Sequence, residues 1–524
     1  MAGTLLTDQF EILRGGFDRP DMARMGRRPP IIGAIGTFGH GVIEIAPTFF
    51  KFFARLPKIA QRSIKILLPF AVLFALTVLP LPIDIQAQYA LAIFVCISML
   101  WTFGALPLPV TALLVPVLLT FYGIFETDKA LQPFADPVVF LIIGGLIMAE
   151  AFRKHGIDRR LAYSIVSRFG GDVGKILLSF MLVAAFLSMW ISNTATVALL
   201  IPVVLGIASK ASKDKERLSV LFLIGVGVGS AIGGMATITG SAPNAVVSSL
   251  LGSALESSTP SGTWAFVDWM KIGLPTSMVL LVVSWVMLQR IFPVNQTTLD
   301  ITPIQRELKE MGRMSPGEKK VLGIFVPTVV LWIAGASIGE LFGVPASFMS
   351  AAIVALSAAV LLFMTKTIDW QDARSISWDI FLIIGAGLAL GEGLQQSGAA
   401  AWMADVLVSV TGDLHIIVIM VIISFVSIAM SNFMSNTATA AILAPILIGM
   451  SLPLGVDPKL LVLVCGLSVS ISFITPIGTP PFTLIYSTGM VSRRDLARSG
   501  LRMTVPAVLT ICSLVYLMVH FGLV

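Results

Sequence analysis

Long apolar segments recur along nearly the whole chain, and their pattern sets the expected fold. Many of them are close to the roughly 20 residues that cross a bilayer as a helix. Backbone polar groups in hydrocarbon must be paired internally, which leaves helices or a closed barrel. The apolar positions are continuous rather than alternating, so the pattern predicts helices. About eleven spans are expected, at 64–81, 87–105, 107–125, 135–152, 218–256 (broken), 268–292, 319–343, 348–366, 378–398, 458–489 (broken) and 500–523.

Two further apolar segments, 175–210 and 413–453, carry Ser-Asn-Thr at their centres. Each half of such a segment is short for a span, and the polar centre would lie near the middle of the membrane. We interpret both segments as re-entrant helical hairpins, which enter and leave on the same side. The alternative is two short spans joined by a turn. Loop charges do not separate the two, because both return the chain to its starting side.

Composition agrees with a membrane protein, since 56% of the residues are hydrophobic and only 12% are charged. A soluble chain of this size needs more charged surface. The net charge of +6 does not indicate nucleic-acid binding, because the basic residues gather in loops on one side. Lys and Arg mark cytoplasmic loops. They are frequent at 153–175, 210–217, 290–320, 366–374 and 493–498, and absent at 252–267, 338–347 and 394–412. This pattern predicts a multi-pass inner-membrane protein with a cytoplasmic N-terminus, an external C-terminus, and hairpins that enter from opposite faces.

The chain contains an internal repeat. Residues 191–202 and 434–445 both contain Ser-Asn-Thr-Ala-Thr and end in proline. Residues 237–244 and 475–482 then share a threonine followed by Gly-Ser/Thr and a nearby proline. Paired motifs with opposite hairpin entry predict an inverted repeat, which is typical of secondary transporters with a midplane site. The expected parts are a cytoplasmic or interfacial segment at 1–62, repeats at 63–292 and 319–524, and a cytoplasmic linker at 293–318.

Each Ser-Asn-Thr motif is a candidate anion site. Ser, Asn and Thr are favoured N-caps, and helix-compatible residues follow both motifs. A helix that starts at the tip of a hairpin directs unpaired N–H groups and its positive dipole end to that tip. The candidate substrate-binding residues are Ser192, Asn193 and Thr194 in the first half and Ser435, Asn436 and Thr437 in the second.

The broken spans are candidate sodium sites. Gly and Pro free backbone carbonyls, and in lipid these must face a cavity or an ion. Carbonyl, amide and hydroxyl oxygens together suit a hard cation such as Na⁺. We expect one Na⁺ in each half. The ligand sets are Ser188, Ser192, Asn193 and the Gly240 carbonyl in the first half, and Ser431, Asn436 and the Met434 and Gly478 carbonyls in the second.

The paired motifs resemble the divalent anion/Na⁺ symporter family of di- and tricarboxylate transporters, over roughly residues 64–524. The resemblance implies an eleven-span inverted repeat with two re-entrant hairpins. It also implies a homodimer that works as an elevator, with spans 1–4 and 7–9 as the scaffold and the hairpins and spans 5, 6, 10 and 11 as the moving part. In that family the loops at the breaks also contact substrate, which here implicates Ser241, Thr479 and Pro480.

Together, the motifs and this resemblance imply a secondary active importer of C4-dicarboxylates coupled to two or more Na⁺ ions, without an organic cofactor; the choice of anion comes from the resemblance. The alternatives are a sodium-independent dicarboxylate or 2-oxoglutarate exchanger and a transporter of citrate or an inorganic anion. An intramembrane hydrolase would need a Ser–His pair in contact, and no histidine is placed by sequence near a serine nucleophile. A channel would need a continuous polar pore, whereas the polar residues concentrate at the midplane. We expect no enzymatic activity and no nucleic-acid partner.

Overall fold

The computed structural model describes residues 57–211, 214–258, 264–295, 298–411, 414–476 and 478–524. Regular structure in these ranges is entirely helical, which confirms the all-α prediction. Residues 65–524 form one compact unit, and the description below concerns that unit. Most of the expected N-terminal segment, residues 1–56, lies outside the described residues.

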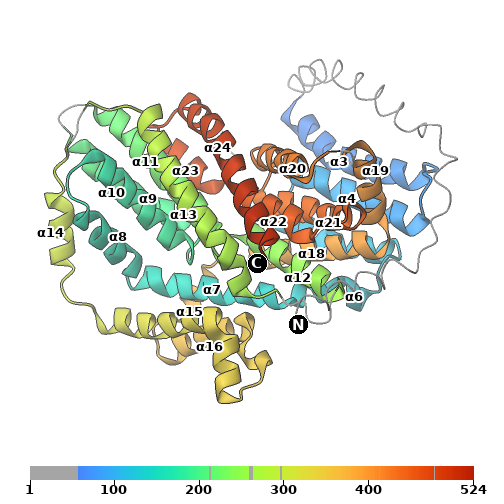
Figure 1. The fold of residues 1–524 in the computed structure, drawn as a ribbon, viewed down its shortest axis with the longest axis horizontal. Coiled ribbons are helices and arrows are strands. Elements are labelled where there is room, and N and C mark those ends of the chain that lie inside the picture. The colour runs from blue at the N-terminus through green and yellow to red at the C-terminus, as the bar shows by residue number, and fades with distance from the viewer. Residues whose placement is uncertain (1–56, 212–213, 259–263, 296–297, 412–413, 477) are drawn as a thin grey trace, which may run out of the picture. The chain divides into compact units, whose positions relative to one another are not determined.

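The predicted spans appear as helices (Figure 1). In the described residues, eight helices are long and apolar enough to cross a membrane, or nine if one bent pair counts as a span. Two of the predicted spans, α5 and α16, are helices of only 14 residues. The helices at predicted spans are α3 (Lys58–Val78), α4 (Ile85–Phe103), α5 (Leu108–Phe121), α7 (Pro137–Lys154), α11 (Lys215–Gly234), α12 (Ala242–Ser258), α13 (Phe266–Ile291), α15 (Pro316–Phe342), α16 (Ala351–Met364), α18 (Asp379–Gln396), α22 (Pro458–Ser468), α23 (Pro480–Ser487) and α24 (Arg493–His520).

Both predicted hairpins are pairs of helices joined at Ser-Asn-Thr. The first consists of α9 (Val173–Ser188) and α10 (Asn193–Ser209), and the second of α20 (Ile416–Ser431) and α21 (Asn436–Leu454). The two helices of each pair contact one another, and α9 also packs closely along α11 (Figure 1). The breaks in the fifth and tenth spans are confirmed, between α11 and α12 and between α22 and α23. The expectation that each half of a hairpin is short for a span is wrong for α21, whose 19 residues are long and apolar enough to cross a membrane. That the hairpins are re-entrant, and that they enter from opposite faces, stay predictions.

The structure contains helices that the sequence did not predict. Residues 394–412 were expected to be a loop, and that expectation is wrong, because α19 (Ala399–Thr411) fills most of the segment. Gly398, at φ +79°, turns the chain after α18, and the two helices meet at 75°. Gly156, at φ +68°, likewise separates α7 from α8 (Ile157–Arg168). Glycine tolerates this left-handed conformation. Each half therefore has a span, a glycine turn and a shorter helix before its hairpin. The other unpredicted helices are α6 (Thr127–Leu131), η2 (Gln132–Ala135), α14 (Thr302–Glu310), η3 (Ala346–Met349) and α17 (Trp370–Arg374).

The helix α8 is attached to the start of α15 by a buried ion pair. The guanidinium of Arg160 pairs with the carboxylate of Glu318, whose side chain is 4% exposed. Arg160 also donates to the carbonyls of Met311 at 3.1 Å and Gly312 at 2.8 Å. One cation thus joins α8, the segment before α15, and α15 itself. This arrangement connects the two halves of the chain near the first hairpin.

Removing the carboxylate of this pair should destabilise the fold. We expect Glu318→Ala to lower the free energy of unfolding by about 3 kcal/mol, because the Arg160 charge would stay buried without its counterion. Unfolding in detergent by SDS titration measures this change. The control is Glu310→Ala, which breaks the exposed pair between Arg306 and Glu310 and should cost less than about 0.5 kcal/mol. Equal effects of the two substitutions would contradict the structural role of the Arg160–Glu318 pair.

Candidate functional site

The first Ser-Asn-Thr motif starts a helix, as the sequence predicts. The helix α10 begins at Asn193, and the Ser192 hydroxyl accepts the N–H of Ala195 at 3.3 Å. The second motif differs in one respect. The helix α21 begins at Asn436 with Ser435 at the N-cap position, but the Ser435 hydroxyl forms no capping bond. In both motifs the N–H groups of the first helical turn have no partner within the helix, apart from the capping bond.

Thr237 makes the shorter of two threonine bonds that hold the first break to the first hairpin; the Thr239 hydroxyl donates to the same carbonyl of Met189 at 3.3 Å. The Thr237 hydroxyl donates to the carbonyl of Met189 at 2.6 Å, next to the hairpin tip. The same oxygen accepts the N–H of Gly240 at 3.0 Å. Thr237 is fully buried, so both bonds are shielded from water. The threonine therefore fixes Gly240, a candidate sodium ligand, relative to the tip of the hairpin.

The second break repeats this arrangement. The Thr475 hydroxyl donates to the carbonyl of Asn432 at 2.7 Å and accepts the N–H of Gly478 at 3.0 Å. Thr475 occupies the position in its break that Thr237 occupies in the first, and Asn432 occupies the position of Met189. The internal repeat thus extends from the sequence motif to matching hydrogen bonds of nearly equal length.

Three of the four residues expected at the first sodium site lie together. The Ser188 hydroxyl donates to the side-chain oxygen of Asn193. A Cβ atom on Gly240 would lie 2.9 Å from the Ser188 carbonyl oxygen and 2.6 Å from the Gly234 carbonyl oxygen. Ser192 is exposed, and its hydroxyl caps its own helix. Sequence reasoning missed Ser230, whose hydroxyl donates to the Asn193 carbonyl at 3.0 Å.

The second expected sodium site is only partly assembled. Asn436 and Gly478 are connected through Ser472, whose hydroxyl donates to the Asn436 side-chain oxygen at 3.0 Å. A Cβ atom on Gly478 would lie 3.3 Å from the Ser472 carbonyl oxygen. The Ser431 hydroxyl instead donates to the Ile428 carbonyl within its own helix at 3.1 Å. The side chain of Met434 is buried.

Sequence reasoning also missed Ser472 and Asn432. Ser472 occupies the place of Gly234 in the repeat, and a Cβ atom on Gly234 would lie 2.4 Å from the Asn193 side-chain oxygen. The two motif asparagines therefore contact equivalent positions of their respective breaks. Aligning the breaks residue by residue would have pointed to Ser472. Asn432 had a simpler signal, since it is an amide in an apolar segment directly after Ser431.

The two halves pack against each other crosswise. The helix α10, which starts at the first Ser-Asn-Thr, contacts α23, which starts after the second break. The helix α21, which starts at the second Ser-Asn-Thr, contacts α12, which starts after the first break. The remaining candidate substrate residues lie at these helix starts. Thr194 and Thr437 are in the first turns of α10 and α21, Ser241 directly precedes α12, and Thr479 and Pro480 form the start of α23.

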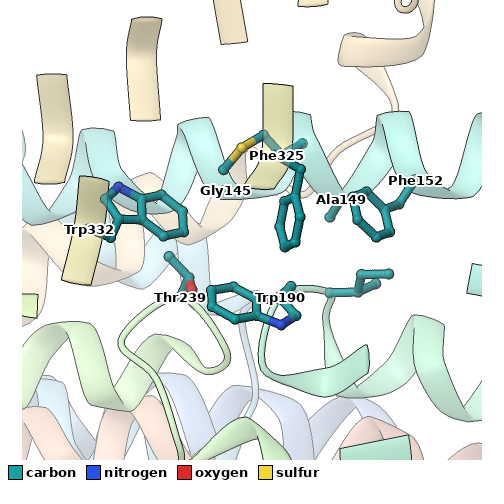
Figure 2. Close-up of a pocket in the computed structure, with 9 residues that line it drawn as sticks. Gly145, Ala149, Phe152, Trp190, Thr239, Phe325 and Trp332 are labelled. Atoms are coloured by element: carbon teal, nitrogen blue, oxygen red, sulfur yellow. The ribbon is translucent and has the colours of Figure 1, made fainter. Parts of the chain in front are cut away.

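A separate hollow lies between the tip of the first hairpin and the helices α7 and α15 (Figure 2). Trp190 of the hairpin tip stacks on Trp332 of α15, with ring centroids 6.1 Å apart, and meets the edge of Phe325 at 5.3 Å. The lining also includes Thr239 of the first break and Phe152 of α7. No lining residue carries a charge, and the walls are mostly aromatic or aliphatic. The hollow is therefore an unsuitable site for an anion.

Comparison with known proteins identifies the family. The model of the sodium:sulfate symporter transmembrane region matches residues 60–522. The chain belongs to this symporter family. The resemblance to divalent anion/Na⁺ symporters is thereby confirmed, and family and fold are those of membrane transporters rather than enzymes.

Relatives with a stated activity are similar over most of the chain. The sodium-dependent dicarboxylate transporter SdcS of Staphylococcus saprophyticus is 30% identical over 473 residues, which cover 85% of this chain and 89% of that protein. SdcS of Staphylococcus aureus is 31% identical over the same length, with the same coverage. An uncharacterized transporter of Methanocaldococcus jannaschii is 35% identical over 429 residues, 82% of this chain and 93% of that protein.

Two solved transporter structures share the fold. The YdaH transporter of Alcanivorax borkumensis aligns with a TM-score of 0.53 at 14% identity, over 76% of this chain and 88% of that chain. MtrF of Neisseria gonorrhoeae aligns with a TM-score of 0.54 at 12% identity, over 74% of this chain and 82% of that chain. At such low identity the likeness concerns the fold alone.

Proposed function

We propose that this protein is a sodium-coupled importer of C4-dicarboxylates such as succinate, malate and fumarate. The observation that carries the proposal is the duplicated link between hairpin and break, in which Thr237 and Thr475 make the same pair of bonds. The relatives named as sodium-dependent dicarboxylate transporters support the choice of cation and anion. The site residues and the mechanism that follow are part of the proposal.

The dicarboxylate would be held without a charged side chain. The candidate residues, from Ser192 to Thr194, Ser435 to Thr437, Ser241, Thr479 and Pro480, supply hydroxyls, amides and backbone N–H groups. Helix starts favour anions by roughly 0.3–1 kcal/mol each in exposed settings. The crosswise packing of α10 with α23 and α12 with α21 would direct such starts to one region. Binding of this moderate strength allows release on the other side of the membrane.

Sodium would complete the site. In the first half, the oxygens of Ser188, Asn193 and Gly240 form the set that Na⁺ would bind, and in the second half Asn436 and Gly478 do so with Ser472 beside them. Ser192, Ser431 and the Met434 carbonyl remain proposed ligands that would join after small local changes. Sodium ions at both hairpin tips would neutralise charge on the dicarboxylate and favour its passage through the membrane.

The proposed motion is an elevator within a homodimer. The hairpins, with α11–α13 and α22–α24, would move against a scaffold made of α3–α7 and α15–α18. The proposed topology keeps the N-terminus in the cytoplasm and the C-terminus outside. The apolar aromatic contact of Trp190 with Phe325 and Trp332 supports the proposal, because contacts without directional bonds resist sliding less than hydrogen bonds do.

Uptake of labelled succinate into proteoliposomes tests the function. We expect an inward Na⁺ gradient to drive accumulation, and replacement of Na⁺ by K⁺ to reduce initial uptake by about tenfold or more, because the two cation sites would stay empty. Unlabelled malate and fumarate should compete, whereas citrate and sulfate should compete weakly. Equal uptake in Na⁺ and K⁺ with internal dicarboxylate present would instead identify a sodium-independent exchanger. Strong competition by sulfate or citrate would overturn the choice of substrate.

A further inference from the structure

Each break has a threonine at the equivalent position, but the asparagines that hold the two breaks are at positions that are not equivalent. We infer that Asn244 and Asn432 are positioning residues, each for the cation site of its own half, and that they act by opposite chemistry. Asn244 acts as a hydrogen-bond donor, and Asn432 acts as an acceptor. The inference rests on the proposed sodium coupling and adds to it that the two cation sites have different supports.

Asn244 holds the first break by donating two hydrogen bonds. It is fully buried in α12, and its amide nitrogen donates to the carbonyls of Gly234 at 2.8 Å and Thr237 at 2.7 Å. These two acceptors fix the orientation of the amide. The side-chain oxygen of Asn244 has no hydrogen-bond partner among the described residues. A buried acceptor without a partner is unfavourable, so the two donor bonds are what this side chain contributes.

The carbonyls that Asn244 holds lie next to the first cation site. A Cβ atom on Gly240 would lie 2.6 Å from the Gly234 carbonyl oxygen and 2.9 Å from the Ser188 carbonyl oxygen. The donor bonds of Asn244 therefore set how the end of α11 lies against Gly240. A side chain that cannot donate would release both carbonyls together.

Asn432 holds the second break by accepting two hydrogen bonds. It is 3% exposed, and its side-chain oxygen accepts the N–H groups of Ile474 at 2.9 Å and Thr475 at 3.3 Å. Its amide nitrogen donates to the Ile428 carbonyl at 2.8 Å, within the hairpin itself. The side-chain bonds that reach the break thus depend only on the side-chain oxygen, besides the bond from the Thr475 hydroxyl to the backbone carbonyl of Asn432. They fix Thr475, which in turn holds the N–H of Gly478.

Neither asparagine has a counterpart in the other half. The residue equivalent to Asn432 is Met189, and the residue equivalent to Asn244 is Phe482. Phe482 is fully buried and lies 5.5 Å from the ring of Phe473, measured between centroids. The helix after the second break is therefore held by apolar packing where the helix after the first break is held by an amide. One substitution, asparagine to aspartate, should therefore impair sodium use at position 244 and have little effect at position 432.

Four variants test the inference, namely Asn244→Asp, Asn244→Leu, Asn432→Asp and Asn432→Leu. The measurement is the Na⁺ concentration for half-maximal succinate uptake in proteoliposomes. Aspartate at 244 cannot make both donor bonds, so this concentration should rise about tenfold, as with leucine. Aspartate at 432 still accepts both N–H groups, so the Na⁺ concentration for half-maximal uptake should change less than about twofold. Leucine at 432 accepts neither, so this concentration should rise about tenfold. The KM for succinate at saturating Na⁺ should change less in every variant.

Hydrogen exchange of the backbone amides gives a second readout that needs no transport. We expect Asn432→Leu to speed exchange at residues 474 and 475, and Asn432→Asp to leave it near the wild-type rate. Similar effects of aspartate at both positions on uptake, or fast exchange at residues 474 and 475 in Asn432→Asp, would overturn the inference. Sodium-independent uptake by the wild-type protein would instead contradict the proposed function, and the exchange rates would still decide whether Asn432 holds the second break as an acceptor.

Discussion

Replacing Asn193 or Asn436 with alanine should reduce sodium-driven succinate uptake by about 100-fold. Asn193 accepts the Ser188 hydroxyl on its side chain and the Ser230 hydroxyl on its carbonyl, and Asn436 accepts the Ser472 hydroxyl on its side chain. Alanine would leave a buried serine without its acceptor and would remove a proposed oxygen ligand of Na⁺ and an amide for the anion. Losing two or three interactions of about 1 kcal/mol each accounts for this magnitude.

The control for this prediction lies on the same helix as Asn193. Ser209 is exposed at the other end of α10, and its hydroxyl donates only to the Gly206 carbonyl one turn earlier, at 2.7 Å. Ser209→Ala should keep uptake within about twofold of wild type. Initial rates in proteoliposomes, normalised to inserted protein, measure all three variants. Uptake at the wild-type rate by Asn193→Ala and Asn436→Ala would contradict the assignment of the site to the two motifs.

Gly233→Ala should cause a large loss of folded protein. A Cβ atom at this position of α11 would lie 2.1 Å from the carbonyl oxygen of Ala185 and 2.3 Å from its Cα. The neighbouring atoms are backbone, so the clash cannot be relieved by a rotamer change, and α9 and α11 would have to separate. We expect the free energy of unfolding to fall by about 3 kcal/mol, at the upper end of the range for overpacked positions.

Gly206→Ala is the matched control for this substitution. Nothing lies within 4 Å of the added Cβ at Gly206, which is in the last turn of α10. Alanine favours a helix over glycine by about 1 kcal/mol, so this variant should be neutral or more stable. Melting of the purified proteins in detergent compares the two. Equal stability of both variants would show that α9 and α11 do not meet as closely as the structure places them.

The sequence was most informative where polar residues interrupt long apolar segments. The starts of α10 and α21 and the breaks after α11 and α22 follow from Ser-Asn-Thr, glycine and proline, and these are local signals. The helices α8 and α19 were missed because they are shorter than a span and follow a glycine turn. Length and hydropathy identify spans but not helices that bend away from them.

The partners of single polar residues could not be predicted in the same way. Ser230 lies in an apolar helix, Asn432 at the end of one and Ser472 in the second break, and what each one binds depends on how distant helices pack. Ser435 shows that local sequence does not always determine local hydrogen bonds either. Its motif is identical to the first copy over Ser-Asn-Thr-Ala-Thr, yet its hydroxyl forms no cap, so identical local sequence did not give identical local bonding.

The stacking of Trp190 on Trp332 has an optical consequence. The two indoles lie 6.1 Å apart with planes 16° from parallel, one on the tip of the first hairpin and the other on α15. Chromophores this close couple electronically, and the coupling falls steeply with separation. Any displacement of the hairpin along α15 would therefore change the near-ultraviolet circular dichroism and the emission of this pair. The protein thus contains a built-in spectroscopic probe of the movement proposed for it, and Trp332→Phe would remove the signal.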